Sequence, residues 1–133
     1  MTKFITHIAT IEIPVTNLKN AINFYSEILG VKTHSLAAQS AMLTFSTKGV
    51  PTLYLVQTEE NVSLSFKNTN NAVVHSIIDF YTPDLKGFYN WLKEKNVEVA
   101  TLNINHDSGY GGFSFKDPDG NTFSACNILH PGQ

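Results

Sequence analysis

The order strand, helix and then shorter strands occurs twice along this chain, and this repeat limits the possible folds more than any other feature. The first copy opens with a strand rich in β-branched residues at 5–15 and an amphipathic helix at 18–29. Asn17 is placed to cap the start of that helix, and Gly30 to end it in the left-handed conformation. Three strand segments follow, at 32–36, 41–46 and 52–58. We therefore predict a βαβββ module.

The second copy follows the same order with few identical residues. A strand at 73–82 leads to Pro83, which keeps its predecessor extended, and to Asp84 as the cap of a helix that runs to about Lys95. Asn96 then stands where Gly30 ends the earlier helix. Two further strands, at 113–116 and 122–128, flank a turn at 117–121. We predict one α+β domain, with module one at 4–60, a connector at 61–71 in which 62–66 is an alternative edge strand, and module two at 72–129.

Composition excludes several classes of function. The chain has 133 residues, of which 42% are hydrophobic and 15% charged, and its formal net charge is -2. Because there is no basic cluster and no long apolar run, neither nucleic acid nor a membrane is an expected partner. The single cysteine, Cys126, excludes an internal disulfide, which agrees with a reducing compartment. We expect a cytoplasmic protein.

Two stretches of sequence carry a resemblance to a known family. They are residues 13–31, which contain Ile-Pro-Val-Thr-Asn-Leu, Phe-Tyr and Leu-Gly-Val, and residues 115–121, Phe-Lys-Asp-Pro-Asp-Gly-Asn. In this order they resemble the vicinal oxygen chelate superfamily, which includes glyoxalases, extradiol dioxygenases, fosfomycin-inactivating transferases and bleomycin-binding proteins. The resemblance implies that the two modules form a concave mixed sheet, the glyoxalase/bleomycin-resistance fold. It also implies a homodimer and a small-molecule partner.

The metal ligands that the resemblance would imply are not found at the matching positions. The two histidines and the glutamate of metal-dependent members correspond here to Thr10, Ile77 and Ser124. Divalent metals in such sites require imidazole or carboxylate donors, so we predict no metal cofactor. His7 and His75 lie three and two residues upstream of the expected positions, and a β-bulge is one way to shift either of them into place. A displaced divalent-metal site is therefore the alternative, against ordinary surface or rim histidines.

Strand parity predicts where two acidic side chains point. Residues alternate between the faces of a strand, so Ile13 and Ile78 beneath the helices leave Glu12 and Asp79 on the concave face. Each acid lies three positions before the end of its strand. A carboxylate there requires a partner, so the pair binds a cationic or donor-rich ligand, supplies a general base, or only bonds to neighbouring strands.

Aromatic and polar residues on the same predicted walls complete the candidate ligand-binding site. Flat rings are suited to enclosing a planar ligand, although each ring is equally suited to a sheet core. The glycine-rich stretch at 108–112 lacks a phosphate-loop pattern, so it is a plain loop or a rim that lets Tyr110 close over a ligand. The predicted ligand-binding residues are Glu12, Asp79, Thr10, Phe45, Tyr54, Tyr81, Tyr110, Phe113 and Ser124.

Three functions follow from this sequence. The first is metal-independent binding or sequestration of a small organic ligand, of which an antibiotic-like cation is one example. The second is a glyoxalase-like lyase or a dioxygenase-like enzyme that uses a displaced metal site. The third is a structural or regulatory module whose cavity is filled by its own side chains. No serine or cysteine motif indicates nucleophilic catalysis.

Overall fold

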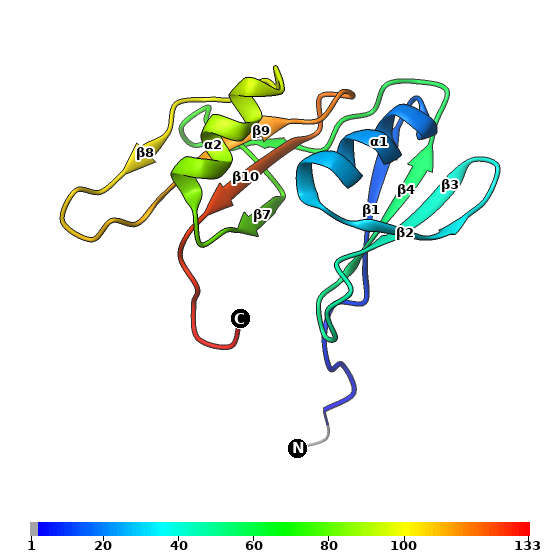
Figure 1. Ribbon diagram of the computed structural model, residues 1–133, viewed down its shortest axis with the longest axis horizontal. Coiled ribbons are helices and arrows are strands. Elements are labelled where there is room, and N and C mark those ends of the chain that lie inside the picture. The colour runs from blue at the N-terminus through cyan, green and yellow to red at the C-terminus, as the bar shows by residue number, and fades with distance from the viewer. Residues whose placement is uncertain (1–2) are drawn as a thin grey trace. The chain divides into compact units, whose positions relative to one another are not determined.

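The computed structural model describes residues 3–133, and the chain divides into two compact units, Met1–Val62 and Ser63–Gln133. Each unit contains a four-stranded mixed sheet and one helix (Figure 1), so the predicted α+β fold is confirmed. Within residues 3–133, neither helix is long and apolar enough to span a membrane.

The first unit has the predicted βαβββ order. Its strands pair in the order β1-β4-β3-β2, with β1 parallel to β4 and the other pairs antiparallel. Helix α1 starts at the Asn17 cap, whose side chain accepts from Asn20 N at 3.0 Å, and ends before Gly30 at a φ of 72°. The elements are β1 Thr10–Val15, α1 Leu18–Leu29, β2 Lys32–Leu36, β3 Ser40–Thr44 and β4 Thr52–Gln57.

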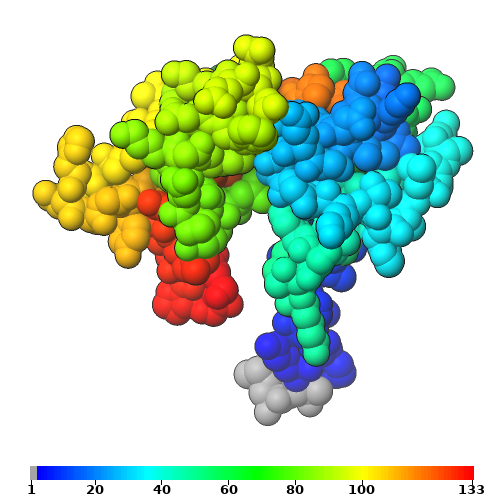
Figure 2. All heavy atoms as spheres, viewed as in Figure 1, coloured from blue at the N-terminus to red at the C-terminus, as the bar shows by residue number. Residues whose placement is uncertain are grey.

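One face of this sheet forms the core with α1. The inward residues alternate along the strands, and with the apolar side of α1 they make one buried set, because an amphipathic helix and a half-buried sheet each have one apolar face. The core of the first unit is Ile13, Val15, Leu18, Ala21, Tyr25, Ile28, Val31, Ala41, Leu43, Leu53 and Leu55. The loop between β3 and β4 extends beside the N-terminal segment (Figure 2), where Thr52 N donates to the Ala9 carbonyl at 3.0 Å.

The second unit has a four-stranded sheet in the order β7-β10-β9-β8, and a separate pair, β5 with β6. Asp84 caps α2 by accepting from Gly87 N at 3.0 Å, and Asn96 takes the left-handed conformation at a φ of 58°. The predicted functions of both residues are confirmed. The elements are β5 Phe66–Lys67, β6 Val74–His75, β7 Ile78–Tyr81, α2 Leu85–Glu94, β8 Asn103–Ile104, β9 Gly111–Lys116 and β10 Thr122–Cys126.

Several elements differ from the sequence-based prediction. The strand predicted at 5–15 begins at Thr10, and residues 3–9 are exposed. The strand predicted at 73–82 is broken, because β6 pairs with β5 while β7 pairs with β10. The two-residue strand β8 was not predicted.

Most of the segment predicted as a connector, 61–71, falls in the second compact unit. Leu64 N donates to Asn121 Oδ1 at 2.7 Å, and Thr122 N donates to the Leu64 carbonyl at 3.1 Å. These bonds join the start of the unit to its last hairpin. The boundary therefore lies at Val62–Ser63, earlier than the pattern of polar residues suggested.

Candidate ligand-binding site

Glu12 and Asp79 occupy equivalent positions in the two units. In the first unit Glu12 lies opposite Tyr54 across the parallel pair of β1 and β4. In the second unit Asp79 lies opposite Ser124 across the parallel pair of β7 and β10. The neighbours Ile13 and Ile78 are buried while both acids are exposed, so each acid lies on the sheet face opposite the core.

Asp79 is held by a chain of hydroxyl groups. Ser124 Oγ donates to Asp79 Oδ1 at 2.7 Å, and Ser76 Oγ donates to Ser124 Oγ at 2.9 Å. Ser114 lies opposite Ser124 on β9. The centre of this sheet face is therefore polar, and Asp79 is its carboxylate.

Two further side chains adjoin Asp79 on the same face. Tyr81 and Cys126 lie opposite each other, two residues beyond Asp79 and Ser124. The Tyr81 ring is 47% exposed and so is available to a ligand. Burial raises the pKa of the Cys126 thiol above its ordinary 9.0, and a hydrogen bond and the negative charge of Asp79 add to the rise. The thiol is thus kept protonated beside the carboxylate, and it is not an activated nucleophile.

On the corresponding face of the first unit, the acidic side chain is not held by hydrogen bonds from the described part of the chain. Glu12 makes no hydrogen bond or ion pair with residues 3–133 and is exposed. Tyr54 and Met42, its neighbours across the strands, are half-buried. The Thr10 and Thr52 hydroxyls lie 3.1 Å apart, and Phe45 is half-buried just beyond the end of β3.

The residues present do not fit a divalent metal at the family's positions. Thr10 bonds to another threonine, Ile77 is exposed and Ser124 belongs to the hydroxyl chain. Across residues 3–133, no group of three His, Cys, Asp or Glu side chains is close enough together to hold an ion.

The two histidines of the displaced-site alternative have other surroundings. His7 precedes β1, is exposed, and its Nδ1 lies 2.8 Å from the Thr6 hydroxyl. His75 stacks on Phe66 with the ring centroids 5.0 Å apart. Its Nε2 is buried and has no partner among the described residues. Among residues 3–133, neither histidine lies in a group of three His, Cys, Asp or Glu side chains that could hold a metal ion.

Phe113 was predicted to line the ligand cavity, and the structure corrects this. Its ring is 5% exposed and packs against Phe88 and Tyr89 of α2, with centroids 5.9 Å and 5.0 Å away. Phe113 lies opposite Ala125, whereas the next residue, Ser114, lies opposite Ser124. Parity therefore places Phe113 in the core, on the face opposite Asp79.

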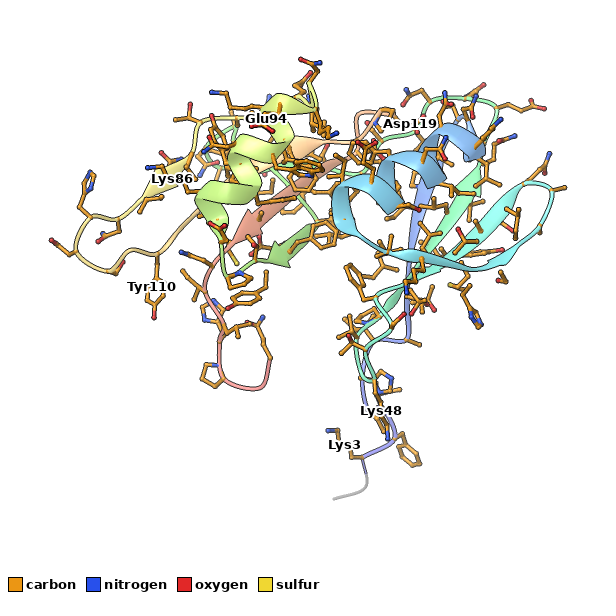
Figure 3. All side chains as sticks on the ribbon, in the orientation of Figure 1. Lys3, Lys48, Lys86, Glu94, Tyr110 and Asp119 are labelled. Atoms are coloured by element: carbon orange, nitrogen blue, oxygen red, sulfur yellow. The ribbon has the colours of Figure 1, made fainter. Side chains whose placement is uncertain are left out.

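Tyr110 belongs to a hydrogen-bonded hairpin. Asn105 N donates to the Tyr110 carbonyl at 2.8 Å, and Asn127 bonds to Gly109 and Gly111 at 3.0 Å and 2.9 Å. Of the stretch at 108–112 that was predicted as a plain loop or a rim, residues 108–110 lie in the turn between β8 and β9, and Gly111 and Gly112 begin β9. The Tyr110 side chain is 53% exposed and points away from this turn (Figure 3).

Sequence reasoning missed three members of the polar face, Ser76, Ser114 and Cys126. Cys126 has the same parity as Ser124 on β10, so the alternation that identified Ser124 was sufficient to find it. Ser76 was not detectable in this way. In an unbroken strand it has the opposite parity from Asp79, and only the interruption between β6 and β7 allows it to reach Ser124.

A separate cavity of about 560 Å³ lies in the first unit. It is lined by the first turns of α1, the turn between β2 and β3, and Gln57. Gln57 Oε1 accepts from Leu18 N at 2.9 Å, so this amide also closes the start of the helix. None of the nine predicted ligand-binding residues lines this cavity.

Comparison with known proteins identifies the fold. A family model described as Glyoxalase/Bleomycin resistance protein/Dioxygenase superfamily matches residues 5–125. No curated protein matches the chain. Among solved structures, an integron cassette protein from the mobile metagenome of Halifax Harbour sewage outfall has 21% identity and a TM-score of 0.71, covering 93% of this chain and 100% of that one.

Two structures with assigned activities are also similar. Lactoylglutathione lyase from Agrobacterium tumefaciens has 18% identity and a TM-score of 0.64, covering 92% of this chain and 93% of that one. The fosfomycin resistance protein FosX from Listeria monocytogenes has 14% identity and a TM-score of 0.69, with 97% and 96% covered. At these identities the likeness concerns the fold alone.

Proposed function

Since this chain belongs to the Glyoxalase/Bleomycin resistance protein/Dioxygenase superfamily, we propose that it binds a small organic ligand without a metal ion. The polar anchor is Asp79 on the sheet face of the second unit. One observation carries the proposal: an exposed carboxylate is held by a hydroxyl chain at 2.7 Å and 2.9 Å, beside an exposed aromatic ring at Tyr81. A fixed charged group next to an aromatic surface is typical of small-molecule sites.

The chemistry of the donor set supports binding more than a metal-dependent reaction. Threonine, isoleucine and serine stand at the three positions where metal-dependent relatives are expected to hold the ion. Of these three residues, only Ser124 forms a hydrogen bond with Asp79, and it does so as the donor. No feature of residues 3–133 favours the lyase or dioxygenase alternative. The homodimer and the cytoplasmic location remain predictions drawn from the sequence.

On the sheet face of the first unit, Glu12 is the proposed anchor, because it has the same register in its own unit as Asp79 has in the other. Its neighbour across the strands is Tyr54, so this face also offers a carboxylate next to a ring. Thr10 and Phe45 belong to the same unit as Glu12. We expect Glu12 to contribute less than Asp79, because no hydroxyl group fixes its orientation.

The test is a thermal-stability screen of the full chain with small molecules, with and without a chelator. A ligand that binds the native state stabilises it by about 2.7 kcal/mol at a concentration of about 100 times its Kd, which raises the melting temperature by several degrees. We expect such shifts to persist in EDTA and to be lost in Asp79→Asn. Asp107→Asn, the same change on the exposed turn between β8 and β9, is the control and should keep them.

Two results would count against the proposal. Shifts that vanish in EDTA and return with added zinc, nickel, iron or manganese would favour the enzyme alternative. The absence of any shift across the whole panel would favour a cavity filled by the protein's own side chains.

A further inference from the structure

We infer that Ser76 and Ser124 are positioning residues that orient the carboxylate of Asp79 through its Oδ1 atom. In this orientation the site selects ligands with hydrogen-bond donors, above all planar cations, over neutral and anionic ones. The inference rests on the proposed function, since it names the class of ligand that the same face takes. It depends on the direction of the hydroxyl chain and on the break in the strand that precedes β7.

The hydroxyl chain runs in one direction. Each serine hydroxyl has a single proton to donate, and a carboxylate only accepts. Ser76 gives its proton to Ser124, and Ser124 gives its own to Asp79 Oδ1. With Oδ1 bound in this way, the carboxylate is held in one orientation, and its second oxygen, Oδ2, accepts no hydrogen bond from either serine. The donors of the chain are already used, so the face has acceptors to offer a ligand.

The break between β6 and β7 is what completes this chain. In a continuous strand, Ser76 and Ile78 have the same parity, and Ile78 is buried on the core side. The interruption after His75 instead brings Ser76 Oγ within 2.9 Å of Ser124 on the opposite face. The irregular segment thus adds a second hydroxyl behind Asp79 that a regular strand would have kept away from it.

The protein supplies no cation to Asp79 from the part of the chain that the structure describes. Lys116 has the same parity as Ser114 on β9, but its Nζ lies 3.2 Å from Glu98 Oε2, in an exposed ion pair. The titratable side chains that adjoin Asp79 on this face are Tyr81 and Cys126; neither forms a cation, and the Cys126 thiol stays protonated. The positive or donor group that complements Oδ2 therefore has to come from the ligand, and the exposed Tyr81 ring offers it a planar surface.

Binding of matched probes tests this inference. Benzamidinium, benzamide and benzoate have nearly the same shape and differ in charge, and their affinities are measured by calorimetry on the full chain. We expect the wild type to bind benzamidinium about tenfold more tightly than benzamide, the value of one charge-assisted hydrogen bond, and benzoate more weakly still. Ser124→Ala and Ser76→Ala should each reduce this preference, and Ser76→Thr, which keeps a hydroxyl, should restore it.

Controls separate positioning from folding and from the proposed function itself. Ser65 is exposed and forms no hydrogen bond with Ser76, Ser124 or Asp79, so Ser65→Ala should leave the preference for benzamidinium unchanged. A purely structural effect of Ser76→Ala would lower the melting temperature without changing the ratio of affinities. Equal binding of benzamidinium and benzoate, no binding of benzamidinium, or an unchanged ratio in both alanine variants would overturn the inference. Asp79-dependent binding of neutral compounds in the thermal screen would then still support the proposed function.

Discussion

Asn121 and Asp117 close the turn between β9 and β10, with Asn121 Nδ2 donating to Asp117 Oδ2 at 2.8 Å. Asp117 Oδ1 also accepts from the backbone N–H of Asp119 and of Asn121, each at 2.9 Å. The side-chain oxygen of Asn121, Oδ1, accepts from Leu64 N, at the start of the second unit. The turn residues are therefore fixed by buried hydrogen bonds, and they secure the two strands that hold Ser124 and Ser114.

Asn121→Ala should destabilise the protein by about 2–3 kcal/mol, because it removes the acceptor of the part-buried Leu64 N–H and the side-chain donor to Asp117 Oδ2. Urea unfolding at constant pH measures the loss. Asn105→Ala is the comparison, since Asn105 Oδ1 also accepts from two backbone N–H groups but in an exposed turn that water can reach. Equal losses in the two variants would contradict the structural function of the buried turn.

Gly30→Ala should cost about 1–2 kcal/mol, since Gly30 ends α1 in the left-handed region at a φ of 72°. No atom lies within 4 Å of the position that a Cβ would take, so the cost is conformational and no steric clash adds to it. Gly30→Asn should cost less, because asparagine tolerates this region and the structure itself places Asn96 in it. Thermal unfolding of both variants gives the ranking, and an alanine variant as stable as the wild type would contradict it.

Local rules predicted the parts of the fold that depend on neighbouring residues. The bounds of α1 and its two caps follow from residues within one turn of each other, and alternation placed Glu12 and Asp79 on the faces opposite the cores. The break before β7 was not predictable in this way. It depends on β6 pairing with β5 and on a bond between Ser76 and Ser124, which are 48 positions apart.

Phe113 shows a different kind of error. Its assignment to the cavity came from the family resemblance, although parity along the strand to Phe115 already indicated the core side. In the structure both rings belong to an aromatic cluster with Phe88. A resemblance between folds identifies a segment, whereas the face on which a side chain lies has to be counted along the strand.

Phe113→Ala should therefore destabilise the second unit by about 3–5 kcal/mol, because it removes a buried ring from the cluster beneath α2. Tyr81→Ala, at a half-exposed ring, should change stability by about 0.5 kcal/mol or less and act on ligand binding instead. Chemical unfolding measures the loss of core packing and the thermal screen measures the loss of ligand binding, and both are applied to each variant. A stable Phe113→Ala variant that lost only ligand binding would restore the original assignment.

Cys126 should make the stability of the protein fall in alkaline solution. Its pKa is raised above 9.0 in the folded state, chiefly by burial, so the folded state holds the thiol proton more tightly than the unfolded state does. The resulting stabilisation is fully present below pH 9.0 and is lost as the pH rises through the folded-state value. Urea midpoints at about pH 8 and about pH 10 should differ less in Cys126→Ser, which has no thiol to titrate.

Alkylation of Cys126 by iodoacetamide tests the contribution of Asp79 to the same shift. The thiolate is the reactive form, so a raised pKa slows the reaction at a given pH. Asp79→Asn removes the negative charge beside the thiol, and the pKa should move down toward 9.0 while burial still keeps it above that value. We expect faster alkylation in Asp79→Asn than in the wild type at about pH 9, with Asp107→Asn unchanged. Identical rates in all three proteins would show that the carboxylate does not act on the thiol, and would weaken the placement of both groups in one site.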